Sequence, residues 1–296
     1  MNPEIYCGAS DEHVHYNNQE LIQGKPVKLF GIEGTDDRTI WLDMKNCTGV
    51  LDSTSFSLLP GLEYISFDNC NFEDCKRAFS SLNKLNSLHI DKGTFPLEPE
   101  TFEDNTSLTV VSLQDIKVPS NPCFQHLQQL ESLSFDTCLF ENLNGTLFSN
   151  LESLKGISIS NCKINVIEND IFDNLSHLEG LNIRDSEIDE INFEVFLKLA
   201  NLKFFSFHHN KINADVDYKT FEQISTLTTV HFDLNVYEIL NFDSLPNLET
   251  VKIGYVDEGD DPKSNEIVEK LQSSGVKTEY VFCGTIECES DLEECS

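Results

Sequence analysis

Apolar and polar residues follow one repeating pattern along most of this chain. In the unit that begins at Leu154, apolar side chains occupy the first, fourth, sixth and eleventh positions, and Phe172 and Leu175 follow later in the unit. Because the fourth and sixth positions flank a polar residue, the unit predicts a short strand with one buried face. The pattern recurs at intervals of 21 to 25 residues, and its ten units begin at Thr39, Leu62, Leu85, Leu108, Leu130, Leu154, Leu178, Leu202, Leu227 and Leu248.

A second feature of the repeat is a phenylalanine that returns once per unit after the strand. These phenylalanines lie at Phe56, Phe79, Phe102, Phe124, Phe148, Phe172, Phe196, Phe221 and Phe242. A fixed period of this length indicates a solenoid, in which each turn contacts only its neighbours. We therefore expect ten short strands stacked in a parallel sheet, with a column of phenylalanine rings inside.

The ninth position of each unit lies where the chain leaves the strand. Asn210 and Asn235 occupy it in two units, and their side chains are expected to hydrogen-bond backbone groups in the turn. Small cysteines take the same position in four other units, at Cys47, Cys70, Cys138 and Cys162. We expect these four to be buried, unpaired thiols.

These units resemble those of extracellular leucine-rich repeat proteins of the typical kind, found in Toll-like receptor ectodomains and in secreted arthropod immune proteins. The resemblance rests on units such as the one from Leu154 to Ile164 and the one from Leu202 to Ile212, and it covers about residues 39–255. It implies an α/β solenoid, a leucine-rich repeat horseshoe with a parallel sheet on its concave face and an irregular convex side. Members of the family bind proteins, lipids, glycans and nucleic acids, so the fold alone does not name a ligand.

The two ends depart from the family's cysteine-rich caps. Residues 1–38 form the expected N-terminal cap, with a strand around Val27–Ile32 that covers the first turn. Residues 39–255 hold the repeats, and 256–296 form a C-terminal cap and an acidic tail. In that cap, Asp261 and Pro262 open a predicted helix, Gly275 ends it, and 276–282 form a final strand.

Charge and processing signals narrow the possible partners and compartments. The formal net charge of -31 disfavours nucleic acid and anionic lipid and favours basic partners. No apolar run is long enough to span a membrane, and the first seven residues lack a signal core. Either the protein is cytosolic, or a signal was removed. Four glycosylation acceptors favour an extracellular protein, secreted or the ectodomain of a membrane protein: Asn46, Asn105, Asn144 and Asn174.

Two of these acceptors bear on the predicted fold. Asn46 is expected to face inward, and Asn105 replaces the leucine of the return path, so a glycan there would mark an open wall. The cysteines outside the repeat are disulfide candidates, and one of them could link two chains into a dimer. They are Cys7, Cys283, Cys288 and Cys295.

The polar strand positions between the buried ones define the inner face. Its C-terminal half combines an aromatic residue, histidines and charges, and we expect the partner-binding surface there: Arg184, Asp185, Phe204, His208, His209, His231 and Asp233. The histidines could in principle bind a metal, but no close motif such as His-x-x-x-His is present, so no metal or other cofactor is expected.

No catalytic motif accompanies the repeat, because neither a nucleophile elbow nor a phosphate-binding glycine loop occurs. An enzyme is therefore not expected. The favoured hypothesis is an extracellular recognition module that binds a protein through the concave face, in innate immunity or Toll-type signalling. The alternatives are an adhesive protein that self-associates through its ends and a cytosolic repeat scaffold.

Overall fold

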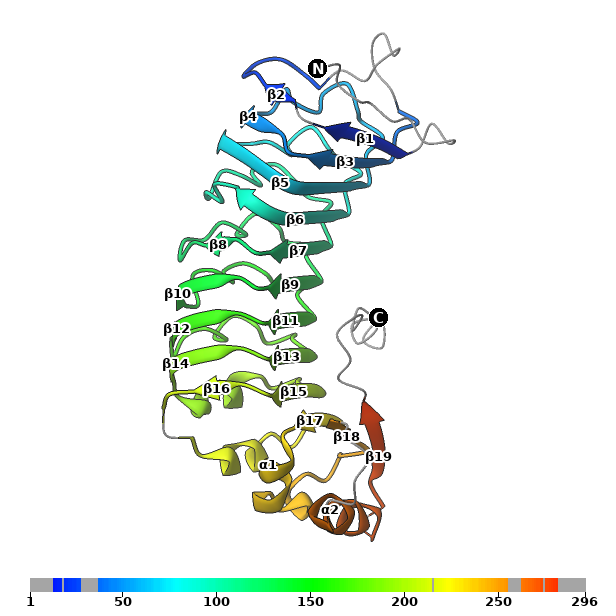
Figure 1. Cartoon of the computed structure of the whole chain (residues 1–296), viewed down its shortest axis with the longest axis vertical. Helices are drawn as coiled ribbons and strands as arrows, with labels where there is room; N and C mark the ends of the chain where they lie inside the picture. Colours follow the sequence, from blue (N-terminus) through cyan, green and yellow to red (C-terminus); the bar gives the residue numbers. More distant parts are fainter. Residues whose placement is uncertain are drawn as a thin grey trace.

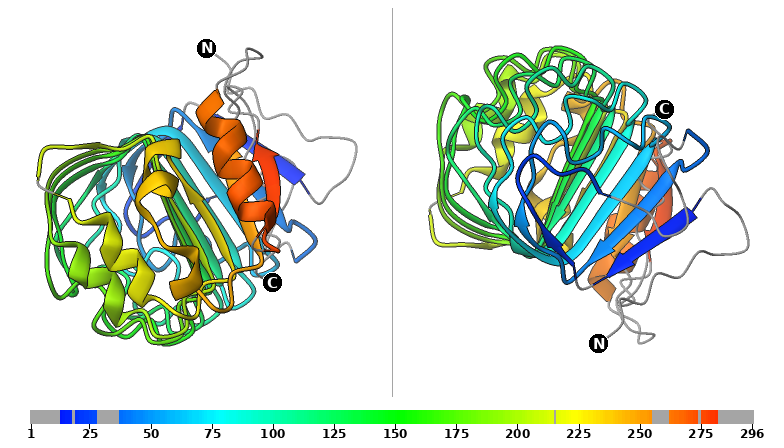
Figure 2. Two further views of the ribbon diagram at one scale, coloured as in Figure 1. Left: turned by 90° about the horizontal axis from the view of Figure 1, so that it is seen from below. Right: turned by 90° about the horizontal axis from the view of Figure 1, so that it is seen from above.

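The computed structural model is an elongated, curved solenoid of stacked turns (Figure 1). It describes residues 13–17, 19–27, 37–214, 216–254, 262–273 and 275–281. One long parallel sheet lines the concave side, and the chain returns from each strand along the opposite wall (Figures 1 and 2). The solenoid of stacked parallel strands expected from the pattern is thereby confirmed.

All ten predicted strands form, and they pair in chain order. They are β3 (Trp41–Lys45), β5 (Tyr64–Asp74), β6 (Ser87–Thr94), β7 (Val110–Gln114), β9 (Ser132–Asp136), β11 (Gly156–Ser160), β13 (Gly180–Arg184), β15 (Phe204–His208), β17 (Thr229–Phe232) and β18 (Thr250–Gly254). Adjacent strands pair unit position to unit position, as Ile157 with Leu181 and Ile159 with Ile183 show. The repeat thus sets the register of the sheet, because a slip by one residue would turn the buried side chains to solvent.

The core lies between this sheet and the return path. The fourth and sixth residues of every unit are buried, from Leu42 and Met44 in the first to Val251 and Ile253 in the last. All nine repeat phenylalanines are buried too. Successive rings stack near the N-terminal end, with 5.5 Å between the ring centroids of Phe79 and Phe102. A buried interior of this kind is stable only when each turn is covered by its neighbours.

A second, smaller parallel sheet forms after the turns that end the concave strands (Figure 1). The sequence pattern did not predict this sheet. Its five strands are β8 (Lys117–Val118), β10 (Leu139–Leu143), β12 (Lys163–Ile167), β14 (Glu187–Ile191) and β16 (Lys211–Ile212). Ion pairs join some of its neighbouring strands, with Lys117 Nζ 2.6 Å from a Glu141 oxygen and Lys211 Nζ 2.6 Å from a Glu187 oxygen. The middle turns of the solenoid are therefore sheet-like on two sides.

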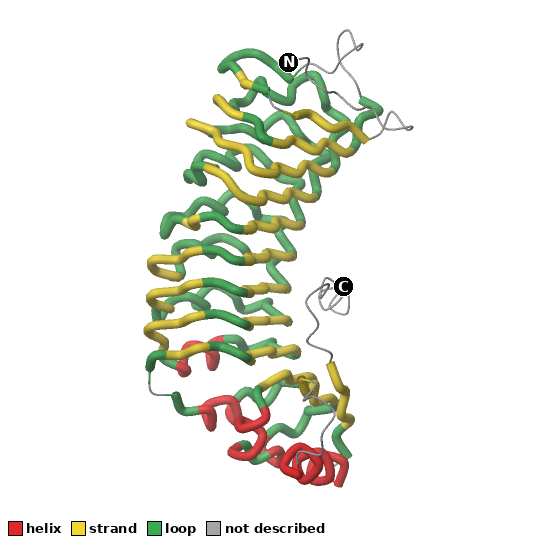
Figure 3. The backbone as a smooth tube through the Cα atoms, viewed as in Figure 1, coloured by secondary structure: helices red, strands yellow, loops and turns green. Residues whose placement is uncertain are grey.

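The helices lie on the return path and at the C-terminal end, and Figure 3 shows them in red beside the yellow strands. Short 3-10 helices follow the later strands: η1 (Phe193–Lys198), η2 (Tyr218–Gln223) and η3 (Phe242–Ser244). Near the N-terminus, β2 (Glu20–Leu21) pairs with β4 (Thr48–Val50). Within the described ranges, no helix has the length and apolar character needed to cross a membrane.

The ends are closed by elements that partly match the expectation. The predicted C-terminal helix and strand form as α2 (Pro262–Ser273) and β19 (Lys277–Val281), and β19 pairs with β18. At the N-terminal end, the first turn is covered by β1 (His13–Asn17), which pairs with β3. Of the strand expected over 27–32, Val27 lies outside any strand and the rest lies outside the described residues.

The ninth positions form a hydrogen-bonded ladder along the strand exits. The backbone N–H of Cys138 donates to Sγ of Cys162 (3.3 Å), that of Cys162 to Oγ of Ser186 (3.1 Å), and that of Ser186 to Oδ1 of Asn210 (3.1 Å). Asn210 thus acts as expected. The expectation for Asn235 is wrong, because the chain turns there into helix α1 (Leu234–Ile239) and leaves Asn235 exposed.

Candidate functional site on the concave face

The concave surface is built from the fifth and seventh residues of each unit, because these side chains alternate with the buried ones along each strand. The paired strands β13, β15 and β17 bring the predicted partner-binding residues together near the C-terminal half of the sheet. Arg184 lies beside His208, and Ser206 lies beside His231. The predicted set therefore does form one contiguous region.

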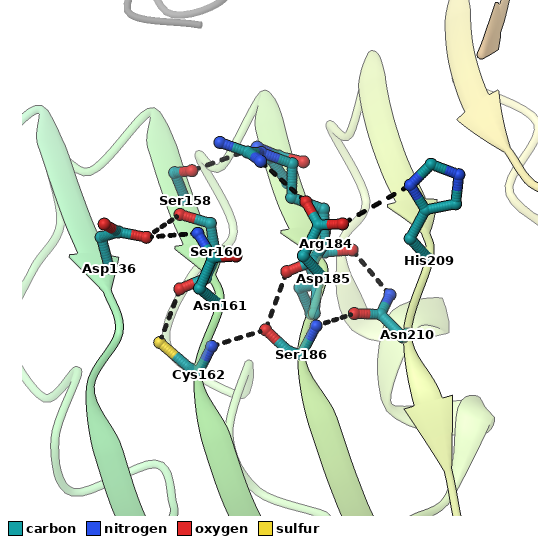
Figure 4. A network of polar contacts seen from close by, with 12 residues as sticks. Asp136, Ser158, Ser160, Asn161, Cys162, Arg184, Asp185, Ser186, His209 and Asn210 are labelled. Carbon is teal, nitrogen blue, oxygen red and sulfur yellow. Dashed lines mark hydrogen bonds and ion pairs between the residues drawn. The ribbon is translucent and has the colours of Figure 1, made fainter. Parts of the chain in front are cut away.

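Four side chains of this region make a chain of ion pairs that is open to solvent. Figure 4 shows three of them, Arg184, Asp185 and His209. Nη1 of Arg184 lies 2.8 Å from Oδ2 of Asp185, whose Oδ1 lies 3.5 Å from Nδ1 of His209. The backbone N–H of His209 donates to Oδ1 of Asp233 at 2.9 Å. We call Arg184, Asp185, His209 and Asp233 the charged ridge. It presents both signs of charge to a partner.

The backbone explains the orientation of the ridge. Asp185 and His209 both occupy the eighth position of their units, with φ near the left-handed region at 52° and 54°. The sequence pattern had placed His209 on a strand. In the structure, β15 ends at His208 and His209 lies in the turn that follows it. In this turn the His209 side chain is 48% exposed. On a strand it would have packed between side chains of the adjacent strands.

The other two histidines of the predicted set are not available to a partner. His208 is only 4% exposed and His231 only 5% exposed, and their rings stack with centroids 3.8 Å apart. Burial, together with the nearby His208 and Lys252, lowers the pKa of His231 to about 3. The sequence interpretation of these two residues as exposed contact groups is therefore wrong, and they serve as packing beneath the ridge.

Phe204 lies at the edge of the same region and is half-buried. Nζ of Lys252 sits 5.2 Å from the centroid of its ring, a cation–π arrangement. Lys252 is itself 7% exposed, so the pair closes the floor of the concave surface here. Part of the Phe204 ring remains accessible beside the charged ridge.

A polar network continues from the ridge toward the middle of the sheet (Figure 4). Oδ1 of Asp136 accepts from Oγ of Ser160 (3.0 Å) and from Nδ2 of Asn161 (2.7 Å). Each of these contacts joins neighbouring turns. The side chains that border the ridge are thus held by hydrogen bonds and do not have to become ordered when a partner binds.

The opposite end of the concave face carries a group that the sequence analysis overlooked. His13 and His15 on β1 both contact Asp43 on β3, beside Trp41, which is 41% exposed. The signal that could have found it is His-x-His in a strand, because residues two apart share a face. It was missed because the N-terminal segment does not carry the repeat pattern.

The glycosylation candidates differ in accessibility. Asn46 and Asn174 are exposed and Asn144 is half-buried. Asn105 is 2% exposed, and its Nδ2 donates to the carbonyl oxygens of Phe79 and Leu82, both at 3.3 Å. The folded chain leaves no room for a glycan at Asn105. The wall of the return path is closed at Asn105 by these hydrogen bonds.

The cysteines of the solenoid are buried and free. These are Cys47, Cys70, Cys75, Cys123, Cys138 and Cys162. Burial raises the pKa of the Cys75 and Cys123 thiols, which keeps them protonated and unreactive. The disulfide candidates Cys7, Cys283, Cys288 and Cys295 lie outside the described residues.

Comparison with known proteins agrees with this geometry. A leucine-rich repeat model matches residues 152–212, and a model of the BspA type leucine-rich repeat region matches 41–138. Neither model describes an enzyme. No curated protein matches the chain in sequence.

Solved structures of repeat proteins resemble this fold. TLR13 in its complex with ssRNA13 matches with a TM-score of 0.52 and 19% identity over 75% of this chain, which spans 41% of the TLR13 chain. Internalin C2 of Listeria monocytogenes (TM-score 0.45, 21% identity) covers 62% of this chain and 76% of its own. A leucine-rich repeat protein of Leptospira interrogans (TM-score 0.48, 15% identity) covers 82% and 72%.

At these identities the structural matches speak for the fold alone, and the two repeat models together cover more than half of the 296 residues. Both repeat models agree with the repeating turns of the solenoid. The chain therefore belongs to the leucine-rich repeat proteins.

Proposed function

We propose that this chain is a non-enzymatic recognition module that binds a protein partner through the C-terminal half of its concave face. The observation that carries the proposal is the charged ridge, in which Arg184, Asp185, His209 and Asp233 are partly exposed and fixed by mutual contacts. Charged groups held in advance on a rigid sheet give orientation and specificity at a small entropic cost. The accessible part of Phe204 adds an apolar contact beside them.

The charge of the chain indicates the kind of partner. A formal net charge of -31 attracts a basic protein surface at long range, and the carboxylates of Asp185 and Asp233 offer acceptors to arginine or lysine at contact. TLR13 was solved with a single-stranded RNA. The same charge opposes RNA binding here, since phosphate binding depends on clustered lysine and arginine.

The compartment and the pathway are part of the proposal. We place the protein outside the cell, as a secreted protein or an ectodomain, because Asn46, Asn144 and Asn174 are accessible acceptors. A role in innate immunity or Toll-type signalling is consistent with the resemblance of its repeats to Toll-like receptor ectodomains. Mass mapping of the secreted protein should find glycans at some of these three sites and none at Asn105.

The binding test is a pull-down from the extracellular fluid of the organism that makes the protein. It compares the immobilised wild type with two immobilised variants. The Arg184→Ala/His209→Ala variant disrupts the ridge, and Lys117→Ala removes a matched exposed charge from the second sheet. We expect the wild type and Lys117→Ala to capture at least one protein in common. The ridge variant should capture that protein at least tenfold less well. Hot-spot arginines commonly cost 2 kcal/mol or more, at about 1.4 kcal/mol per factor of ten. Equal retention of every saturable partner would refute the ridge as the binding surface.

A further inference from the structure

We propose that His13, His15 and Asp43 form a binding site for a divalent transition-metal ion of the zinc class at the N-terminal end of the concave face. The three residues come from two paired strands, and the register places His15 beside Asp43. Because His13 and His15 are two positions apart on β1, their side chains share one face. This is the one group of three metal-ligand side chains found within the described ranges.

The donor atoms already converge. Nε2 of His13 lies 2.7 Å from Oδ2 of Asp43, and Nδ1 of His15 lies 3.2 Å from the same oxygen. One ligand atom from each residue falls within 4.8 Å of the other two. Zinc binds imidazole nitrogen and carboxylate oxygen at about 2.0–2.2 Å. An ion among these atoms therefore requires only small side-chain rotations.

The residues around the three ligands orient them. Nε1–H of Trp41 donates to Oδ1 of Asp43 at 3.0 Å, which leaves Oδ2 directed at the two imidazoles. The Trp41 ring packs on Tyr64, with centroids 3.9 Å apart, and its centroid lies 5.1 Å from that of His13. A partner that fixes a ligating carboxylate in this way is typical of metal sites.

The donor set decides which ion the site would take. Two imidazoles and one carboxylate suit zinc, copper, nickel or cobalt, whereas calcium and magnesium prefer oxygen ligands alone. Three protein ligands also leave one position of a tetrahedral ion open, for water or for a donor atom of a bound partner. The half-buried ligands keep that position accessible from the concave side.

The protein carries its own reporter for this site, because Trp41 is its single tryptophan. Tag-free protein is titrated with Cu²⁺ or Ni²⁺ while tryptophan fluorescence is excited selectively over tyrosine. We expect saturable quenching at one ion per chain, reversed by excess Zn²⁺ and not by excess Ca²⁺. Quenching that Ca²⁺ reverses as well as Zn²⁺ does would indicate binding to the general acidic surface and overturn the proposal.

Variants assign the ligands. His13→Ala and Asp43→Asn should each weaken the ion's affinity tenfold or more, whereas His177→Ala, an exposed histidine on the return path, should leave it unchanged. Unchanged affinity in the double variant His13→Ala/His15→Ala would refute the site. Electron paramagnetic resonance of the Cu²⁺-loaded wild type requires no variant to fold. The spectrum should show coupling of the Cu²⁺ electron to two nitrogen nuclei, one from each histidine. A spectrum with oxygen ligands only would exclude the proposed site.

Discussion

At the scale of single residues, one position per turn determines how the chain leaves the concave sheet. The eighth residue of eight successive units has a left-handed backbone, with φ between 49° and 59°. These residues are Asn46, Asn69, Lys92, Asp115, Thr137, Asn161, Asp185 and His209. Asparagine and aspartate tolerate this conformation best after glycine, and β-branched residues tolerate it worst. The preference explains five of the eight choices and singles out Thr137.

Replacing Thr137 with asparagine should therefore stabilise the protein. Its φ of 55° is costly for a β-branched side chain, and the side chain is exposed, so no packing is lost. We expect Thr137→Asn to raise the free energy of unfolding by about 0.5–1 kcal/mol. Denaturant titration measures the change. Thr94→Asn is the control, because Thr94 is exposed in strand β6, where asparagine gives no benefit. An equal gain in both variants would contradict the backbone argument.

A second prediction concerns the ladder at the ninth positions. Oδ1 of Asn210 accepts from the Ser186 N–H at 3.1 Å, and its Nδ2 donates to the carbonyl of Ile183 at 2.8 Å. Asn210→Ala removes the side-chain partner of both backbone groups, and we expect it to cost about 1–3 kcal/mol. Asn235→Ala removes the same chemistry from an exposed position of α1 and should cost less than about 0.5 kcal/mol. Similar denaturant midpoints for the two variants would disprove the role of the ladder.

At the scale of strands, β15, β17 and β18 bury polar side chains on the face that is otherwise open. His208, His231 and Lys252 lie together there, each less than 8% exposed. His231 stays neutral in the fold because burial, and then the neighbouring positive groups, lower its pKa to about 3. An unfolded histidine binds a proton at about pH 6.5. Between these values the unfolded chain holds more protons, so stability falls as the pH falls.

The contribution of His231 can be isolated with His231→Gln, which cannot titrate. Below about pH 6.5 the wild type should lose up to about 1.4 kcal/mol per pH unit relative to the variant, since that is the cost of one unit of pKa shift. Urea denaturation of both proteins at about pH 7.5 and 5.5 gives the difference, and subtraction removes the effect of the many carboxylates. If the stabilities of the two proteins changed equally with pH, His231 would take up a proton in the folded protein as readily as in the unfolded chain.

The strands also show what sequence reasoning could and could not reach. The ten concave strands were predictable because each is specified by its own buried pair, such as Ile157 and Ile159, repeated in register. The second sheet was not, because strands as short as Lys117–Val118 carry no periodicity of their own. The site at His13 and Asp43 depends on a contact between β1 and β3 that joins a segment outside the repeat to the first turn.

The ridge was predicted only in part, for a similar reason. Sequence position placed Arg184, His208 and His231 in one region, and the strand register confirms it. Exposure could not be predicted, because it depends on stacking between His208 and His231 and on the packing of Lys252 against Phe204. Side-chain contacts between neighbouring turns vary from unit to unit even where the backbone repeats.

At the scale of the whole molecule, an extended solenoid carries a large charge of one sign. The formal net charge is -31, and the stacking of turns places some carboxylates side by side, as Asp68 and Asp91 on paired strands show. Close ion pairs such as Lys117 with Glu141 and Lys203 with Glu179 relieve part of this repulsion locally. The rest acts between turns and opposes the compact state. Long-range repulsion of this kind is sensitive to salt, whereas apolar stacking in the core is not.

We therefore expect the thermal midpoint to rise with NaCl between about 10 and 300 mM at neutral pH, over the range in which the screening length falls from about 30 Å to below 8 Å. The same titration near pH 4.4, the isoelectric point, is the control, because the net charge is then close to zero and the slope should largely vanish. Differential scanning calorimetry measures both series. Equal slopes at the two pH values would mean that salt acts through something other than net charge, and that the close ion pairs already neutralise the repulsion between turns. A steep slope at neutral pH alone would show that the net charge works against the stacked repeats.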